Sequence, residues 1–387
     1  MKQPHSAHIW KQSLALLALI LAALACTIKP ASSIPENTTQ TSRLTPAPKK
    51  TAVSGSDGLV EIPLKIGKAG RGPYYEIFFT DPFSPRASLT EGGVDTPMQE
   101  AINDARISID VAIYSISLYS IEQALLQAHK RGVKVRMVME SDNMTDAVPL
   151  ALISAGIPVV GDLREGLMHN KFMIIDQTDV WTGSMNFTTS GVYEDNNNVI
   201  RLTSPRVVKD YLREFEEMYK NNYFGPDIVA ETPYQSITIN NSRLEVYFSP
   251  DDRVARRIAA LLRGAKDSIN VMAYSFTAND FGDVLRQKAQ DGLTVTGVMD
   301  ESQIESNTGT EYDSFKQLGL QIYPDGNPGL MHHKVFIIDR EIVITGSYNF
   351  TASAERNNDE NVLIFFDKQI AAFYMEEFQR VYNKAKK

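Results

Sequence analysis

The feature that most constrains the fold of this 387-residue chain is an internal duplication. Residues 75–79 (YEIFF) match 244–248 (LEVYF), and residues 108–115 match 268–275. The offset between matching segments stays at about 160 residues along the chain. A repeat of this length is a duplicated domain, because solenoid repeats are far shorter. We therefore expect two similar folding units.

Within each copy, apolar runs rich in β-branched residues alternate with segments of helical periodicity. The runs that predict strands are 107–113, 133–139, 169–175, 268–273, 293–299 and 332–338, and those that predict helices are 121–126, 205–221, 254–262 and 368–385. Strands that alternate with helices indicate the α/β class. We expect two α/β/α domains with mixed, mostly parallel sheets.

The N-terminus has the pattern of a secretory signal peptide over residues 1–25. Lys2 and Lys11 precede an apolar run at 14–24, and small residues stand at Ala23 and Ala25. Cys26, the single cysteine, follows directly, which excludes an intrachain disulfide and resembles a bacterial lipoprotein box. We expect an exported protein that is secreted or held on a bacterial cell surface by a lipid on Cys26.

Composition and the positions of Gly and Pro predict the remaining domain boundaries. Residues 26–70 begin with a stretch rich in Thr, Pro, Ser and Ala, which predicts a flexible tether. The first domain is expected at 71–225 and the second at 244–387. Gly225-Pro226 and Thr232-Pro233 mark a linker at 226–243.

The same string stands near the end of each copy. The first copy reads His169-x-Lys171-x4-Asp176, then six residues, then Gly-Ser-x-Asn with Ser184 and Asn186. The second copy repeats every spacing, with the residues His332, Lys334, Asp339, Ser347 and Asn349. A single His-x-Lys on a strand usually lies on the surface without a functional role, but two copies with identical spacing indicate a site.

Strand geometry makes the pattern chemically sensible. Side chains alternate faces along a strand, so each His and Lys two residues apart share a face. Short turns after Asp176 and Asp339 predict that the next strand returns as a hairpin carrying the Ser and Asn of the string. Two pseudo-symmetric copies would then gather two imidazoles, two ammonium groups and two amides, a set suited to a phosphoryl group.

The doubled string resembles the HKD motif of the phospholipase D superfamily, over roughly residues 74–386. The resemblance implies one active site at the interface of the duplicated domains, and two-step hydrolysis of a phosphodiester. One His attacks phosphorus to give a covalent phosphohistidine, while the other protonates the leaving oxygen and then activates water. It implies that Lys171, Lys334, Asn186 and Asn349 hold the phosphoryl oxygens. Asp176 and Asp339 count with the catalytic set, although their odd spacing predicts that they brace the hairpin or the lysine.

The two copies differ after the hairpin. Glu360 of the second copy aligns with Asn197 of the first. The resemblance implies that an acidic residue here orients a catalytic histidine, so we expect Glu360 to stabilise protonated His332. His332 would then be the general acid, and neutral His169 the nucleophile.

The remaining candidates favour no metal or cofactor. His129 stands on a polar helix face, and His333 should point away from the site and serve structure. No carboxylate stands at metal-ligand spacing from a histidine. We expect no cofactor and activity that EDTA does not abolish.

The motif defines a reaction and leaves the substrate open. A phospholipid is the first expectation, because a lipid anchor at Cys26 would place the enzyme on a membrane. The alternatives are an exported metal-independent nuclease and a surface protein that binds phosphorylated ligands without turnover. The net charge of −8 and the acidic segments 140–142 and 300–301 argue mildly against an extended nucleic-acid track. No obligate protein partner is evident.

Overall fold

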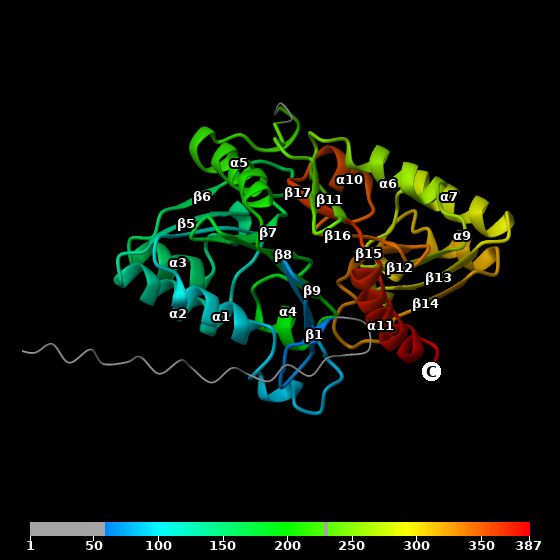
Figure 1. Cartoon of the computed structure of the whole chain (residues 1–387), viewed down its shortest axis with the longest axis horizontal. Coiled ribbons are helices and arrows are strands. Elements are labelled where there is room, and N and C mark those ends of the chain that lie inside the picture. Colours follow the sequence, from blue (N-terminus) through cyan, green and yellow to red (C-terminus); the bar gives the residue numbers. More distant parts are fainter. Residues whose placement is uncertain (1–58, 228–230) are drawn as a thin grey trace, which may run out of the picture. The chain divides into compact units, whose positions relative to one another are not determined.

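The computed structural model describes residues 59–227 and 231–387, which belong to one compact unit, Thr51–Lys387. The expected signal peptide, Cys26 and most of the expected tether lie outside the described residues. The unit consists of two lobes, each built on one sheet (Figure 1).

The first lobe has a nine-stranded sheet in the order β1-β2-β3-β9-β8-β7-β4-β5-β6. Its strands are β1 (Val60–Glu61), β2 (Lys68–Arg71), β3 (Tyr75–Phe79), β4 (Ser108–Ile113), β5 (Lys134–Met139), β6 (Val159–Gly161), β7 (Lys171–Ile175), β8 (Asp179–Gly183) and β9 (Asn198–Leu202).

The second lobe repeats this plan in an eight-stranded sheet, β10-β11-β17-β16-β15-β12-β13-β14. Its strands are β10 (Ser236–Ile239), β11 (Ser242–Ser249), β12 (Ser268–Ala273), β13 (Thr294–Met299), β14 (Gln321–Pro324), β15 (Lys334–Ile338), β16 (Ile342–Gly346) and β17 (Glu360–Phe366).

Both sheets are mixed, as expected, but the expectation of mostly parallel strands is wrong. Only the pairs β4–β5, β5–β6, β12–β13 and β13–β14 are parallel, and every other named pair is antiparallel. The physical reason is the hairpins that carry the motifs. Asp176 and Gln177 have φ values of 51° and 55°, as do their counterparts Asp339 and Arg340 at 53° and 54°, which gives a tight reversal into an antiparallel neighbour.

Helices cover both faces of each sheet, which confirms the α/β/α layers (Figure 1). In the first lobe, α2 and α5 contact the sheet, and α1 and α3 pack against α2. In the second lobe, α7 and α9 contact the sheet beside α6, and α11 crosses most of its strands. The helices are α1 (Asp95–Asp104), α2 (Tyr119–Lys130), α3 (Ala147–Ser154), α4 (Thr189–Tyr193), α5 (Pro205–Asn221), α6 (Val254–Arg263), α7 (Asn279–Gln290), α8 (Glu301–Ser306), α9 (Tyr312–Gln317), α10 (Ala352–Arg356) and α11 (Lys368–Ala385).

The two lobes share a continuous hydrophobic core. One buried cluster runs from the first lobe through Met331 and Val335 to Tyr374 and Phe378 of α11. A second cluster lies between the other face of the second sheet and α6 and α7. The seam between the lobes is therefore as buried as a domain interior, and it is where the motif residues meet.

Two expected boundaries need correction. The expected tether at 26–70 contains β1 and part of β2, which pair onto the first sheet, so the folded part begins by residue 60. The expected linker at 226–243 contains β10, which pairs with β11 at the edge of the second sheet. Among the described residues, no helix has the length and apolarity to cross a bilayer.

Candidate active site

The two motif histidines lie at the seam, each tied by its backbone to the other lobe. The amide of His169 donates to the carbonyl of Asp359 at 3.0 Å, and the amide of His332 donates to the carbonyl of Asn196 at 3.0 Å. These reciprocal bonds fit the expected pseudo-twofold arrangement. Both histidines are buried, with 7% and 5% of their surface exposed.

The side-chain bonds of the histidines are also crossed between lobes. Nδ1 of His169 lies 2.7 Å from Oε2 of Glu360, and Nδ1 of His332 lies 2.9 Å from Oδ1 of Asn197. The amide nitrogen of Asn197 donates to the carbonyl of Gly191 at 2.9 Å, which turns its oxygen toward His332. Both partners are acceptors, so each Nδ1 carries the hydrogen and each Nε2 is left for chemistry.

The expected pairing of Glu360 with His332 is therefore wrong, because Glu360 bonds His169. The error came from aligning the copies as if each glutamate or asparagine served its own lobe. In the fold, strands β9 and β17 begin at the seam, so Asn197 and Glu360 each reach the opposite lobe.

The motif lysines flank the histidines within the same buried site. Nζ of Lys171 donates to the carbonyl of His169 at 2.8 Å, and Nζ of Lys334 donates to that of His332 at 2.9 Å. Burial lowers the pKa of Lys171 to about 7, against a smaller opposing effect of Glu360. Burial, and then the charge of Lys171, hold the pKa of Lys334 well below its usual range. An incoming phosphate anion would favour the charged form of both.

Burial also sets the histidine charges. It lowers the pKa of His169 to about 4, with Glu360 acting in the opposite direction. It holds the pKa of His332 well below its usual range, assisted by Lys334, Lys171 and His169. Residues of both lobes thus act on one another electrostatically, and the lowered pKa values leave both imidazoles neutral at pH 7.

Two tyrosines of the site carried no predicted role, although both stand in the repeated segment that ends β4 and β12. The ring of Tyr114 lies edge-on to His169 at 5.1 Å, and that of Tyr274 lies edge-on to His332 at 4.9 Å. The same rings lie 5.1 and 4.8 Å from Nζ of Lys171 and Lys334. Both tyrosines are partly exposed, so they form walls of the site. Their matched positions in the two copies were the available signal.

The serines of the strings lie behind the histidines. Oγ of Ser184 donates to Oδ1 of Asn197 at 2.8 Å, so Ser184 helps to orient the residue that holds His332. Oγ of Ser347 accepts the amide of Asn361 at 3.0 Å. Gly183 precedes Ser184 and has φ 149°. A Cβ at this position would lie 2.2 Å from the carbonyl oxygen of Asn198. The glycine of the string is thus a steric requirement.

The string asparagines remain candidate phosphate ligands. Asn186 and Asn349 are partly exposed, and the NH2 group of each side-chain amide can donate to a phosphoryl oxygen. Two other asparagines, Asn198 of β9 and Asn361 of β17, connect the two lobes. Asn361 bonds Asn170, Thr182 and Tyr211 of the first lobe, and Asn198 bonds His333, Thr345 and Tyr374 of the second. These reciprocal bonds lock the seam.

The inclusion of Asp176 and Asp339 in the catalytic set needs correction. The carboxylate of Asp176 accepts the backbone amides of Arg106, Ile107 and Ser108 at 2.6–3.1 Å. Asp339 does the same with residues 266–268 at 2.8–3.1 Å. Both brace the hairpin against the start of the neighbouring strand, which agrees with their odd spacing from the histidines.

The acidic segments 140–142 and 300–301 are structural in part. Glu140 and Asp300 are buried, and they accept the amides of Met168 and Met331 at 3.0 and 2.9 Å. They therefore hold the residue before each histidine. His333 is fully buried, with Nε2 3.1 Å from Glu377, which confirms its structural place.

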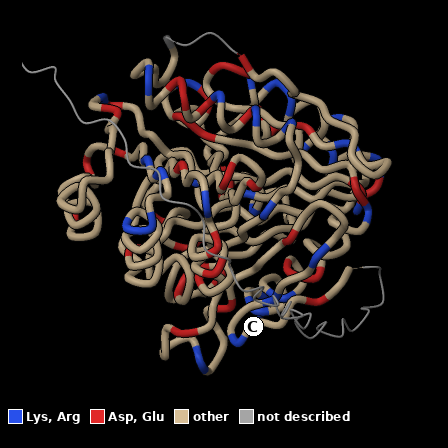
Figure 2. Tube along the Cα trace, turned by 60° about the vertical axis from the view of Figure 1, so that its left-hand side comes forward, with Lys and Arg blue, Asp and Glu red and all other residues tan. Residues whose placement is uncertain are grey.

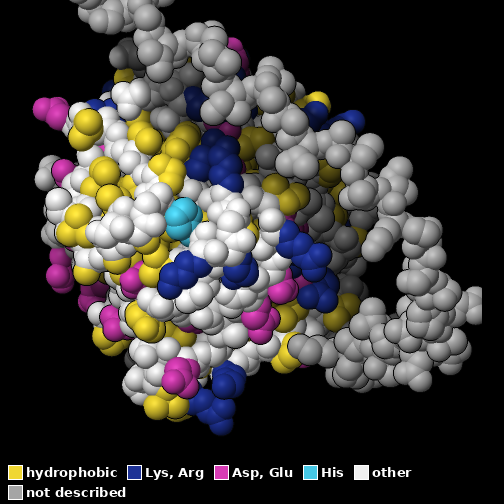
Figure 3. Space-filling model, turned by 90° about the vertical axis from the view of Figure 1, so that its left-hand side faces the viewer, with side chains coloured by type: hydrophobic (Ala, Val, Ile, Leu, Met, Phe, Trp, Pro, Cys, Tyr) yellow, Lys and Arg dark blue, Asp and Glu magenta, His cyan; other side chains and the backbone are white. Residues whose placement is uncertain are grey.

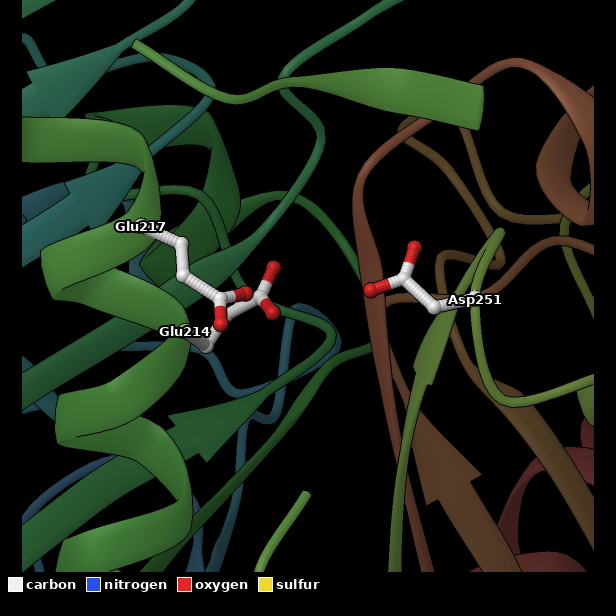
Figure 4. Close-up of side chains that lie close together, drawn as sticks. All are labelled: Glu214, Glu217 and Asp251. Carbon is white, nitrogen blue, oxygen red and sulfur yellow. The ribbon is translucent and has the colours of Figure 1, made fainter. Parts of the chain in front are cut away.

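One acidic cluster lies beside the seam. Figure 4 shows Glu214 and Glu217 of α5 facing Asp251, which follows β11. In the second lobe the positions of Glu214 and Glu217 are taken by Glu377 and Arg380, an ion pair at 2.7 Å. Burial raises the pKa of Asp251 to about 7 and holds that of Glu214 well above its usual range. Acidic groups gather in this way without an ion, and we assign no metal to them.

The chain matches a protein family described as "Cardiolipin synthase, PLD-like domain" twice, over residues 98–219 and 258–382. These matches cover both lobes and both motifs, so the chain belongs to the phospholipase D family, as the doubled string indicated.

Individual relatives match one part of the chain. Human mitochondrial cardiolipin hydrolase is 34% identical over 134 residues, 35% of this chain and 52% of the relative. A phospholipase D of Rickettsia prowazekii is 31% identical over 150 residues, 38% of this chain and 73% of the relative. The chain thus spans about half the length of the cardiolipin hydrolases that it matches.

One solved structure shares the fold over most of the chain. Phosphatidylserine synthase of Haemophilus influenzae has a TM-score of 0.56 at 12% identity and covers 75% of this chain and 84% of its own. Nuc of Salmonella typhimurium, a phospholipase D family member, is 32% identical with a TM-score of 0.34, and covers 37% of this chain and 95% of its own.

Proposed function

We propose that this protein is a phosphodiesterase that hydrolyses a phospholipid through a covalent phosphohistidine. The observation that carries the proposal is the pair of buried imidazoles, each with Nδ1 held by the opposite lobe and flanked by its own lysine. Two ammonium groups stabilise a phosphoryl group whose negative charge is spread over several oxygens.

The geometry supports a two-step reaction. Nε2 of His169 attacks phosphorus, the bond to the alcohol oxygen breaks, and that oxygen takes a proton from Nε2 of His332. His332 then takes a proton from water, the hydroxide attacks phosphorus, and the bond to His169 breaks. Because both imidazoles are neutral at pH 7, His332 takes up its proton together with the anionic substrate, whose charge raises the pKa of that imidazole.

His169 is the better nucleophile of the two because of Glu360. The phosphohistidine carries a positive charge on its ring, and the carboxylate at 2.7 Å stabilises that charge. The amide of Asn197 gives His332 no such charge compensation. His169 was also the nucleophile that the sequence predicted. That prediction paired Glu360 with His332, whereas Glu360 in fact bonds His169.

Several features favour a lipid over a nucleic acid. The curated relatives include a cardiolipin hydrolase and a phospholipase D. Leu163, in the loop that leads to His169, is 84% exposed, and Glu165 of the same loop is an exposed acidic residue. Figure 2 shows acidic and basic residues intermingled, and on the face seen in Figure 3 the Lys and Arg side chains lie in separate groups. A polyanion is held best by a continuous basic track.

Export and a lipid on Cys26 complete the proposal, since they would hold the site near its substrate. Metabolic labelling with a fatty acid tests this part. Label in the full chain and none in the variant Cys26→Ser supports the anchor, and an unlabelled full chain contradicts it.

The decisive test offers residues 27–387 two substrates side by side, with and without EDTA. We expect head-group release from phosphatidylcholine vesicles that EDTA leaves unchanged, and no cleavage of plasmid DNA. Cleavage of DNA alone would make the protein a nuclease. Binding of phosphorylated ligands without turnover of either would make it a non-catalytic binding protein. Loss of activity in EDTA and recovery with zinc would contradict metal independence.

A further inference from the structure

A cavity on the surface of the second lobe is lined by four arginines, and we call it the arginine cavity. Its volume is about 850 Å³, and its walls come from α6, the end of α10, Pro226 and Pro250 (Figure 1). The arginines are Arg253, Arg256, Arg263 and Arg356. All four are exposed, and within the described residues none of their side chains makes a hydrogen bond or an ion pair.

A fifth arginine of the same helix shows what a structural arginine looks like here. Arg257 donates from Nε and Nη2 to the two carboxylate oxygens of Glu245 at 2.7 and 2.8 Å, which fastens α6 to β11. The arginines of the cavity have no such partner, so their guanidinium groups are free for a ligand. A guanidinium group can bind two oxygens of a phosphate at once.

The fold does not require these arginines, because the other copy lacks them. At the four equivalent positions the first lobe has Gly93, Thr96, Asn103 and Tyr193. Two pairs of fully buried residues fix the register of α1 against α6, Met98 with Ile258 and Ile102 with Leu262. The cluster of positive charge is therefore a property of the second lobe alone.

Three acidic residues also line the cavity, and each is accounted for. Glu355 accepts the amide of Ala255 at 2.8 Å and the hydroxyl of Tyr348 at 3.0 Å. Asp280 stands in the first turn of α7, where a negative charge favours the helix. Burial raises the pKa of Asp251 to about 7, so it carries only part of a charge at neutral pH. The unpaired arginines therefore outweigh the acids, and the cavity favours an anion.

One wall of the cavity is joined to the loop that leads into the active site. Arg356 is followed by Asn357, whose carbonyl oxygen accepts a hydrogen bond from Arg164. Leu163, next to Arg164 in that loop, is 84% exposed. An exposed apolar side chain close to free cations is the combination that binds a lipid surface, since the apolar group enters the bilayer and the cations meet anionic head groups.

We propose that the arginine cavity binds the phosphate of an anionic phospholipid and so docks the enzyme on the membrane that carries its substrate. This inference rests on the proposed phospholipid substrate. The bound lipid is not the one being cleaved, because no motif histidine or lysine lines the cavity. Docking concentrates the enzyme at the membrane and supplies no group to the reaction.

The test is binding to vesicles, which needs no turnover. Residues 27–387 are sedimented with vesicles of phosphatidylcholine alone and of phosphatidylcholine mixed with phosphatidylglycerol. We expect tighter binding to the mixed vesicles. The double variant Arg256→Gln, Arg263→Gln should lose at least about tenfold in that affinity, because each basic residue near an anionic membrane strengthens binding by roughly fivefold.

The matched control removes two charges elsewhere. Lys130 ends α2 and Lys134 begins β5, and both are exposed residues of the first lobe. The double variant Lys130→Gln, Lys134→Gln should bind the mixed vesicles as the unaltered chain does. Thermal unfolding of both double variants checks that each is folded.

Three outcomes would overturn the proposal. They are equal binding of mixed vesicles by the arginine variant and the unaltered chain, an equal loss in the lysine variant, and a loss of plasmid DNA binding in the arginine variant while vesicle binding is kept. The last of these would assign the cavity to a nucleic acid.

The unaltered chain's hydrolysis of the soluble diester bis(p-nitrophenyl) phosphate reports the enzymatic function separately. An unaltered chain without this activity would contradict the phosphodiesterase proposal. An active chain whose vesicle binding does not depend on Arg256 and Arg263 would contradict the docking proposal alone.

Discussion

The carboxylate of Glu360 lies 2.7 Å from Nδ1 of His169, although 191 residues separate them along the chain. The bond crosses the seam between the lobes, and Asn197 makes the reverse crossing to His332. Each histidine is therefore oriented by the lobe that does not contain it.

Replacing Glu360 by glutamine should slow turnover by roughly a hundredfold or more. The amide can still accept the Nδ1 hydrogen, but it no longer compensates the charge of the phosphohistidine. The measurement is kcat on short-chain phosphatidylcholine, with the exposed Glu165→Gln as control. Equal kcat values for the two variants would show that the carboxylate has no part in the reaction.

Replacing either histidine by asparagine should separate the two steps of the reaction. With bis(p-nitrophenyl) phosphate the leaving group needs no proton, so His332→Asn should release one nitrophenolate per chain and then stall as the phosphohistidine. His169→Asn should give no burst. A burst in His169→Asn with none in His332→Asn would exchange the two roles.

Binding of a phosphodiester should weaken as the pH rises through about 7. Burial lowers the pKa of Lys171 to about 7, so its charge is present below that pH and lost above it. Calorimetry with diethyl phosphate, whose single charge is constant over this range, measures the affinity from pH 6 to 9. Lys171→Met should bind more weakly at pH 6 and show a flatter dependence. If the affinity of Lys171→Met still depended steeply on pH, a group other than Lys171 would be responsible for the titration.

Asp176→Asn and Asp339→Asn should affect stability and spare the chemistry. Each removes a charge that accepts three backbone amides, which we expect to lower the free energy of unfolding by about 1–2 kcal/mol. Folding lowers the pKa of Asp176 below its ordinary value of 3.8, so the carboxylate's contribution is present above that pH and fades in more acidic solution. Urea unfolding checks the loss. A large fall in kcat with unchanged stability would return both residues to the catalytic set.

Local patterns predicted much of the fold because they report local physics. The helices at 205–221 and 368–385 are found at those bounds, since each has an apolar stripe and a sharp start at Pro205 or after Asp367. The strands of the motif were predicted because apolar β-branched runs mark buried strands. The sheet direction was misjudged, although the predicted hairpins after Asp176 and Asp339 already required antiparallel neighbours.

The sequence predicted which residues form the site better than it predicted their hydrogen-bond partners. The histidines and lysines follow from two strings in identical frames, and both pairs lie at the seam. The partner of each histidine depends on how two lobes dock, which no spacing within one copy contains. Tyr114 and Tyr274 were overlooked because an aromatic at the end of a buried strand has the same pattern whether it fills a core or lines a pocket.

The exchange of Asn198 and Asn361 across the seam has an evolutionary consequence. Each asparagine makes hydrogen bonds to the other copy, so a substitution in one half also removes hydrogen bonds from the other. A substitution at either asparagine is therefore expected to require a matching change in the other half. The copies are free to diverge in pairs of positions, as the swapped acid and amide at 195, 197, 358 and 360 already do.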